Sequence, residues 1–129
     1  MKKLLYSEHV RFYIIAYTIM KHLTQAEFSS SIASGISVVD FFATRCGPCQ
    51  MIAPYLEQMD TQLGDTVSFY KVDVDQERML AAQQDITAMP TLKIFNNGKE
   101  VQTIVGADLQ GLWQGIQNQL ANSDLQQAA

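Results

Sequence analysis

One stretch decides the fold of this 129-residue chain: VDFFATRCGPC, residues 39–49. Together with the residues just before it, its first half forms the run ISVVDFFA (36–43), which is apolar on both faces except at Asp40. Such a run is typical of a central strand that is buried on both sides. After the second cysteine, apolar residues recur on one helical face, namely Met51, Ile52, Tyr55, Leu56 and Met59. The stretch therefore predicts a strand that delivers Cys46 and Cys49 to the start of a helix.

The rest of the chain alternates between strand and helix patterns. We expect strands at 19–23, 67–74, 91–95 and 101–105, and helices at 24–33 and 77–84. Asn96-Asn97-Gly98 predicts a hairpin turn, and a last helix carries an inner stripe of Leu109, Leu112, Ile116 and Leu120. Helices between strands imply parallel crossovers, and the hairpin adds an antiparallel pair. The expected fold class is α/β, with a central mixed β-sheet and helices on both faces.

Composition excludes several classes of protein. With 47% hydrophobic and 17% charged residues, the chain is globular rather than disordered, and its length suits one domain. No run approaches the roughly 20 apolar residues of a membrane-spanning helix. A net charge of −4 argues against nucleic acid as a partner. Two cysteines are too few for a disulfide scaffold or for a zinc site, because zinc takes four ligands and both histidines lie within the first 22 residues.

Charge and polarity divide the chain into three parts. Residues 1–19 carry three basic residues against one acidic residue, and we expect an N-terminal extension outside the domain, disordered or translated from an upstream start, with Met20 as the natural first residue. Alternatively, residues 1–19 form an added helix or strand packed on the domain, or a targeting segment. Residues 20–121 form the domain, and the polar residues 122–129 predict a frayed tail.

The two cysteines carry the chemistry. Their C-x-x-C spacing at a helix N-terminus fits a redox disulfide, although two unrelated buried thiols would have the same spacing. Unpaired N–H groups and the helix dipole favour a thiolate at Cys46, and the thiolate is the attacking species. Pro48 is tolerated in the first turn, where N–H groups have no helical partner. We expect Cys46 to be accessible and to attack, and Cys49, one turn deeper, to resolve.

Three motifs in order identify a family resemblance. They are residues 39–49 followed by Met51-Ile52-Ala53-Pro54, then Met89-Pro90-Thr91-Leu92 leading to Phe95 and Gly98-Lys99, and finally Val105-Gly106-Ala107. Over roughly residues 20–121 the chain resembles the thioredoxin family. The resemblance implies a thioredoxin fold and a protein-disulfide reductase that works by dithiol–disulfide exchange through a Cys46–Cys49 disulfide.

Further site residues follow from the resemblance. A buried Asp40 with a raised pKa would accept the proton of Cys49, and Lys71 would neighbour it; an edge-exposed acid and a solvent-facing lysine are the alternatives. The bond before Pro90 would be cis and face the cysteines, and the Met89 backbone would pair with an extended substrate. Gly106 would let that peptide approach closely. The expected substrate-binding residues are Arg45, Gly47, Pro48, Met89, Pro90, Gly106 and Ala107.

One residue departs from the family pattern, because Arg45 stands where the family usually has Trp. A guanidinium beside the nucleophile favours the thiolate and removes an aromatic surface from the substrate groove. We therefore expect a more acidic Cys46 and a higher reduction potential than in a typical member.

The resemblance also implies partners. Electrons would come from NADPH through a flavoprotein thioredoxin reductase, with no cofactor or metal bound by this chain, and the clients would be disulfide-containing proteins. We expect a cytoplasmic monomer with no nucleic-acid partner and no membrane span. The alternatives are an exported thiol–disulfide exchanger, if residues 1–19 direct secretion, and a binding or holdase subunit in which the cysteines are incidental.

Overall fold

The computed structural model describes residues 20–128, so the expectations for residues 1–19 lie outside it. Strands and helices follow in the predicted order, βαβαβαββα. They are β1 (Lys21–His22), α2 (Gln25–Ser31), β2 (Ile36–Phe42), α3 (Gly47–Leu63), β3 (Val67–Asp73), α4 (Arg78–Gln83), β4 (Thr91–Asn96), β5 (Lys99–Val105) and α5 (Leu109–Ala128).

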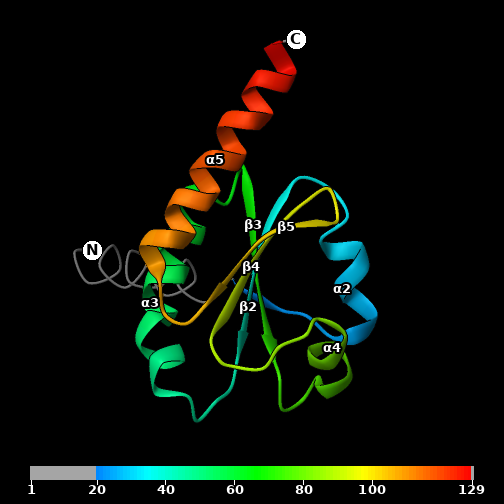
Figure 1. Ribbon diagram of the computed structural model, residues 1–129, viewed down its shortest axis with the longest axis vertical. Helices are drawn as coiled ribbons and strands as arrows, with labels where there is room; N and C mark the ends of the chain where they lie inside the picture. Colours follow the sequence, from blue (N-terminus) through cyan, green and yellow to red (C-terminus); the bar gives the residue numbers. More distant parts are fainter. Residues whose placement is uncertain (1–19, 129) are drawn as a thin grey trace, which may run out of the picture.

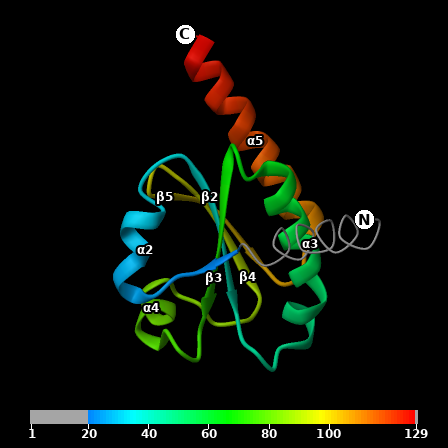
Figure 2. The same ribbon diagram turned by 180° about the vertical axis from the view of Figure 1, so that it is seen from behind.

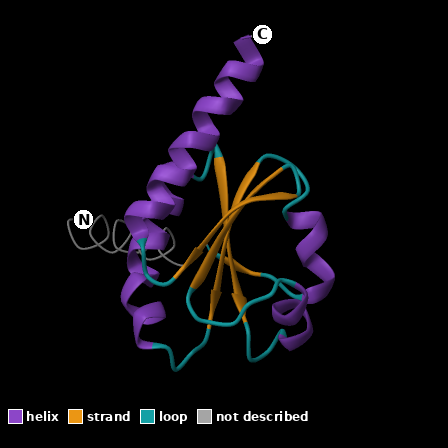
Figure 3. Ribbon diagram, in the orientation of Figure 1, coloured by secondary structure: helices purple, strands orange, loops and turns teal. Residues whose placement is uncertain are grey.

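A five-stranded mixed sheet forms the centre of the molecule, with the strand order β1-β3-β2-β4-β5 (Figure 3). Strands β1, β3 and β2 are parallel, whereas β4 runs antiparallel to β2 and β5 antiparallel to β4. Strand β2 is buried along almost its whole length, as its two-sided apolar pattern predicts. Its register places Asp40 between Lys71 of β3 and Leu92 of β4.

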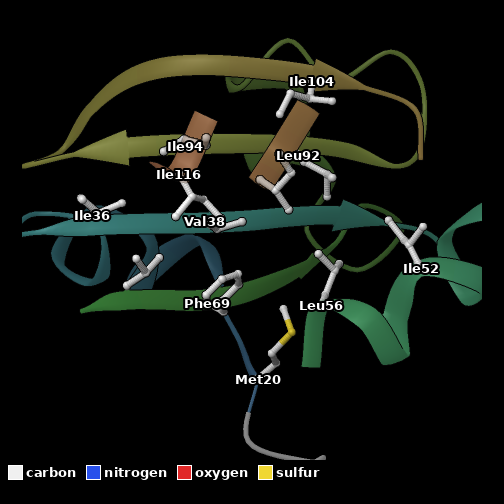
Figure 4. Close-up of a cluster of buried hydrophobic side chains, with 12 residues drawn as sticks. Met20, Ile36, Val38, Ile52, Leu56, Phe69, Leu92, Ile94, Ile104 and Ile116 are labelled. Atoms are coloured by element: carbon white, nitrogen blue, oxygen red, sulfur yellow. The ribbon is translucent and has the colours of Figure 1, made fainter. Parts of the chain in front are cut away.

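Helices cover both faces of the sheet, which confirms the predicted fold class (Figures 1 and 2). Helices α3 and α5 cover one face, where Val38, Leu56 and Ile116 belong to a buried apolar cluster (Figure 4). Helices α2 and α4 cover the other face, where Val39 and Leu80 belong to a second cluster. Successive side chains of β2 therefore enter opposite halves of the core, as alternation along a strand requires.

Local sequence signals fix the chain turns. Thr24 precedes α2, and its backbone N–H donates a hydrogen bond to Glu27 Oε1 over 3.2 Å, which is half of a capping box. Asn97 and Gly98 have φ angles of 51° and 83°, which glycine and asparagine tolerate best, and they form the predicted hairpin turn between β4 and β5.

The C-terminal helix extends further than the sequence analysis expects. Leu112 and Ile116 are buried against the sheet, but α5 continues through the polar residues after Leu120 to Ala128 and projects beyond the sheet (Figure 1). Residues 121–128 contain no glycine or proline that would end a helix. None of the helices within residues 20–128 is long and apolar enough to cross a lipid bilayer.

Candidate active site

Cys46 and Cys49 form a disulfide at the N-terminus of α3, with their Cα atoms 5.2 Å apart. Cys46 is the N-cap residue of the helix, and Pro48 lies in the first turn. The side chain of Cys46 is partly exposed, whereas Cys49 is only 3% exposed. The structure therefore places an accessible sulfur ahead of a shielded one.

Backbone donors of the helix point at the first sulfur. The N–H of Cys49 donates a hydrogen bond to Cys46 Sγ over 3.1 Å. This N–H group has no helical carbonyl partner, because it belongs to the first turn. A negative charge on Cys46 Sγ in the reduced protein would be stabilised by this donor and by the positive end of the helix dipole.

The loop before β4 faces the disulfide. Cys46 Sγ lies 3.5 Å from the carbonyl oxygen of Met89, and the Met89–Pro90 peptide bond is cis. The N–H of Gly106 donates to the carbonyl oxygen of Pro90 over 2.8 Å, which brings the end of β5 to the same place. The structure thus brings together Cys46, Met89, Pro90 and Gly106 from three separate segments.

Glycines leave open space on two sides of this site. Gly106 has a φ of +98°, and a Cβ atom built on it would meet nothing within 4 Å. A Cβ atom on Gly47 would also meet nothing within 4 Å. Pro48, Met89 and Ala107 are exposed beside them, so an extended chain can reach the backbone around Cys46.

A small cavity of about 170 Å³ lies behind the cysteines. Its lining residues are Asp40, Phe42, Ala43, Thr44, Cys49, Gln50, Ala53 and Lys71. Asp40 and Lys71, which pair in register on β2 and β3, thus share one cavity with Cys49. The Lys71 ammonium lies 4.9 Å from the centroid of the ring of Phe42, which also lines the cavity.

Asp40 is a buried carboxyl group without a hydrogen-bond partner among the described residues. It is 1% exposed, and loss of solvation raises its pKa from 3.8 to about 6, while the positive charge of Lys71 acts in the opposite direction. At neutral pH this group is a carboxylate that binds a proton more readily than an exposed aspartate. It can therefore accept a proton from a group that enters the same cavity.

Sequence reasoning missed a contact between two residues that line the cavity, Gln50 and Thr44. Gln50 Nε2 donates a hydrogen bond to the carbonyl oxygen of Thr44 over 2.7 Å, which ties the first turn of α3 to the loop after β2. The only sequence signal for this contact is that a polar residue, Gln50, directly follows Cys49. A polar residue on the first turn of a helix points in many directions, so its partner could not be predicted from the pattern.

The charged residue beside the nucleophile, Arg45, is exposed. Within residues 20–128 its guanidinium forms no ion pair, and the two ion pairs found there are Lys21–Glu27 and Lys93–Glu100. In the same part of the chain, no three side chains of the types His, Cys, Asp or Glu are grouped so that they could hold a metal ion.

A disulfide at a helix N-terminus, packed against a cis-proline loop and backed by a buried carboxyl group, defines a thiol–disulfide exchange protein. Comparison with known proteins specifies the class further. The thioredoxin family model matches residues 19–118. Thioredoxin-1 of Saccharomyces cerevisiae is 48% identical over 94 residues, covering 72% of this chain and 90% of the relative. The thioredoxin of Malassezia sympodialis is 53% identical over 74 residues, covering 57% and 70%.

Solved structures agree with this result. Mitochondrial thioredoxin 3 of S. cerevisiae, in its oxidised form, superposes with a TM-score of 0.74 at 37% identity and covers 80% of this chain and 98% of that one. A thioredoxin of Plasmodium falciparum gives 0.72 at 42% identity, covering 77% and 98%. The chain belongs to the thioredoxin family. It is a thiol–disulfide oxidoreductase that reduces protein disulfides, and the predicted fold and activity are confirmed.

Proposed function

We propose that Cys46 is the nucleophile of this reductase and Cys49 the resolving thiol. In the reduced protein the Cys46 thiolate attacks one sulfur of a client disulfide. A bond forms between Cys46 Sγ and that sulfur, the client S–S bond breaks, and the departing client thiolate takes up a proton from water. The hydrogen bond from the Cys49 N–H to Cys46 Sγ is the single observation that carries this assignment.

Asp40 accepts the proton of Cys49 in the second step. The Cys49 thiolate then attacks Cys46 Sγ, the Cys46–Cys49 disulfide forms, and the second client sulfur leaves as a thiolate that is protonated in turn. Two electrons pass from the dithiol to the client. The shared cavity and the raised pKa of Asp40 support this role, and the Lys71 charge limits the rise so that Asp40 is ionised at neutral pH.

Client chains bind in extended form across the residues around Cys46, of which Pro90 is buried, Gly106 is half-buried and the others are exposed. We define the substrate surface as Arg45, Gly47, Pro48, Met89, Pro90, Gly106 and Ala107. The open space at Gly47 and Gly106 supports a backbone-to-backbone contact, in which client side chains contribute little.

Reducing equivalents come from NADPH through a thioredoxin reductase, and the protein acts as a cytoplasmic monomer without a cofactor of its own. Membership of the thioredoxin family supports a reductase partner and disulfide-containing clients. One similar solved structure is a mitochondrial thioredoxin, so localisation needs a direct test with the full chain and with a form that starts at Met20.

The activity is tested by NADPH- and reductase-coupled reduction of insulin disulfides. The wild type should sustain turnover, and Cys46→Ser should abolish it. Cys49→Ser should accumulate mixed disulfides with client proteins through Cys46, because the resolving step is lost. If Cys46→Ser accumulates mixed disulfides with clients and Cys49→Ser does not, the assigned order of the cysteines is wrong. Full biological activity of Cys46→Ser would instead indicate a binding role.

A further inference from the structure

Arg45 is the single charged side chain of the substrate surface. The other six members are glycine, proline, methionine and alanine residues, which offer backbone groups and apolar contact but no charge. Arg45 directly precedes Cys46 in the chain, so its charged side chain starts from the residue next to the sulfur that a client disulfide must reach. A client that reaches Cys46 therefore approaches a surface whose one charged residue is positive.

This charge has no partner within the described residues. Arg45 is exposed, and no carboxylate oxygen there lies within 4.0 Å of it. An exposed guanidinium without an ion pair has all its donors available, and these donors match the two oxygens of a carboxylate.

Three acidic groups near the same edge of the sheet accept hydrogen bonds from backbone N–H groups. Asp73 Oδ1 accepts the N–H of Asp75 over 2.9 Å, and Glu77 Oε1 accepts the N–H of Gln25 over 2.8 Å. Asp108 follows the substrate surface in sequence, but its Oδ1 accepts the N–H of Gly111 over 2.9 Å at the start of α5. Its charge is thus offset by the helix N-terminus.

The other cations of this region do not offer the same contact. Lys71 is partly buried, and its ammonium packs over the Phe42 ring beside the cavity. Arg78, at the start of α4, directs its Nε to the carbonyl oxygen of Asp75 over 3.3 Å. Arg45 is therefore the cation that a bound client encounters at Cys46.

We propose that Arg45 makes this protein select client disulfides that carry an aspartate or glutamate next to the attacked cysteine. This inference rests on the proposed function and specifies its substrate class. The carboxylate of the client pairs with the guanidinium while the client backbone lies along Met89 and Gly106. Because the pair is exposed, its contribution is modest, and we expect about a fivefold preference for an acidic over a basic neighbour at low salt. The preference should fall as ionic strength rises.

Single-turnover kinetics with matched peptides test this preference. Three synthetic peptides, each closed by one disulfide, would differ only in the residue beside the attacked cysteine, which is Glu, Gln or Lys. Chemically reduced full-length protein would be mixed with each peptide, and the second-order rate constant of reduction would be measured. The Glu-to-Lys ratio of rate constants removes any effect of Arg45 on Cys46 reactivity, because that effect is common to all peptides.

Charge variants provide the decisive comparison. Arg45→Gln should lower the Glu-to-Lys ratio about fivefold, Arg45→Glu should lower it further, and Arg45→Lys should retain part of it. Lys99→Gln is the matched control, because it removes one exposed positive charge at the hairpin end of β5, remote from Gly106, and should leave the ratio unchanged. An equal ratio in the wild type and Arg45→Gln would overturn the inference, whereas failure of the wild type to reduce any peptide would overturn the proposed function itself.

Discussion

The backbone N–H of Cys49 donates to the sulfur of Cys46 over 3.1 Å, so a free donor of α3 is already aimed at the atom that must carry negative charge. The donor is therefore in place before the disulfide is reduced and Cys46 ionises. Preorganised donors of this kind stabilise a developing charge without a reorganisation cost. The reactivity of Cys46 thus follows from where β2 ends and α3 begins.

Asp40 makes the stability of the protein depend on pH. Its folded-state pKa of about 6 lies above its unfolded value of 3.8, so the unfolded chain loses this proton first and stability falls as pH rises between these two values. A rise of the Asp40 pKa from 3.8 to about 6 corresponds to about 3 kcal/mol. Asp40→Asn has no carboxyl group to titrate, so it should not show this loss. In urea titrations of the oxidised proteins, the variant should therefore gain about 3 kcal/mol of unfolding free energy relative to the wild type between acid and neutral pH.

Lys71 supplies the control for the Asp40 prediction. Its positive charge lowers the pKa of Asp40, so Lys71→Met should move the loss of stability to higher pH. A difference between Asp40→Asn and the wild type that stays constant across the pH range would show that burial does not perturb Asp40.

Arg45 should tune the acidity and potential of the site. Replacing Arg45 with Trp removes the positive charge of the residue before Cys46, and we expect the pKa of the Cys46 thiol to rise modestly, since the charge is exposed and screened. The reduction potential should fall, because a less stable thiolate favours the disulfide. Thiol titration and redox equilibration with glutathione check both values, and Arg45→Gln should shift them in the same direction if charge is the cause.

Gln50 should hold the loop after β2 against α3. Gln50→Ala removes the hydrogen bond to the Thr44 carbonyl oxygen and should cost about 1 kcal/mol of unfolding free energy. Gln50→Glu should cost more, because a carboxylate oxygen would then face a carbonyl oxygen. Urea unfolding of the oxidised proteins measures both changes. Equal stability of all three proteins would show that this contact contributes nothing.

The sequence predicts the element order well, because strand and helix periods and turn residues are local signals. Element ends are less accurate: β5 begins at Lys99 rather than Val101, since the hairpin pairs Lys99 with Asn96. The cysteine pair could be placed at a helix start from spacing alone. The Gln50–Thr44 contact and the cavity at Asp40 could not, because they depend on side-chain directions that a pattern does not specify.

A buried lysine outside the active site is stable only as part of a pair. Lys93 is 5% exposed; its ammonium contacts Glu100 and donates to the carbonyl oxygen of Gln84 over 2.8 Å. Glu100→Gln leaves this charge unpaired and should cost about 1–2 kcal/mol, whereas Lys93→Met removes the charge and should change stability by less than about 1 kcal/mol. Thermal unfolding of the two variants measures both changes. A Lys93→Met protein that is less stable than Glu100→Gln would contradict the pairing argument.

The most direct test of the account is titration of Cys46 in the reduced protein, followed by thiolate absorbance in the ultraviolet and by alkylation rate. Cys49→Ser provides a form with a single thiol for assignment. We predict that Cys46 ionises well below the value of about 8.5 found for free cysteine. An ionisation at or above that value would contradict the claim that the start of α3 stabilises the sulfur anion.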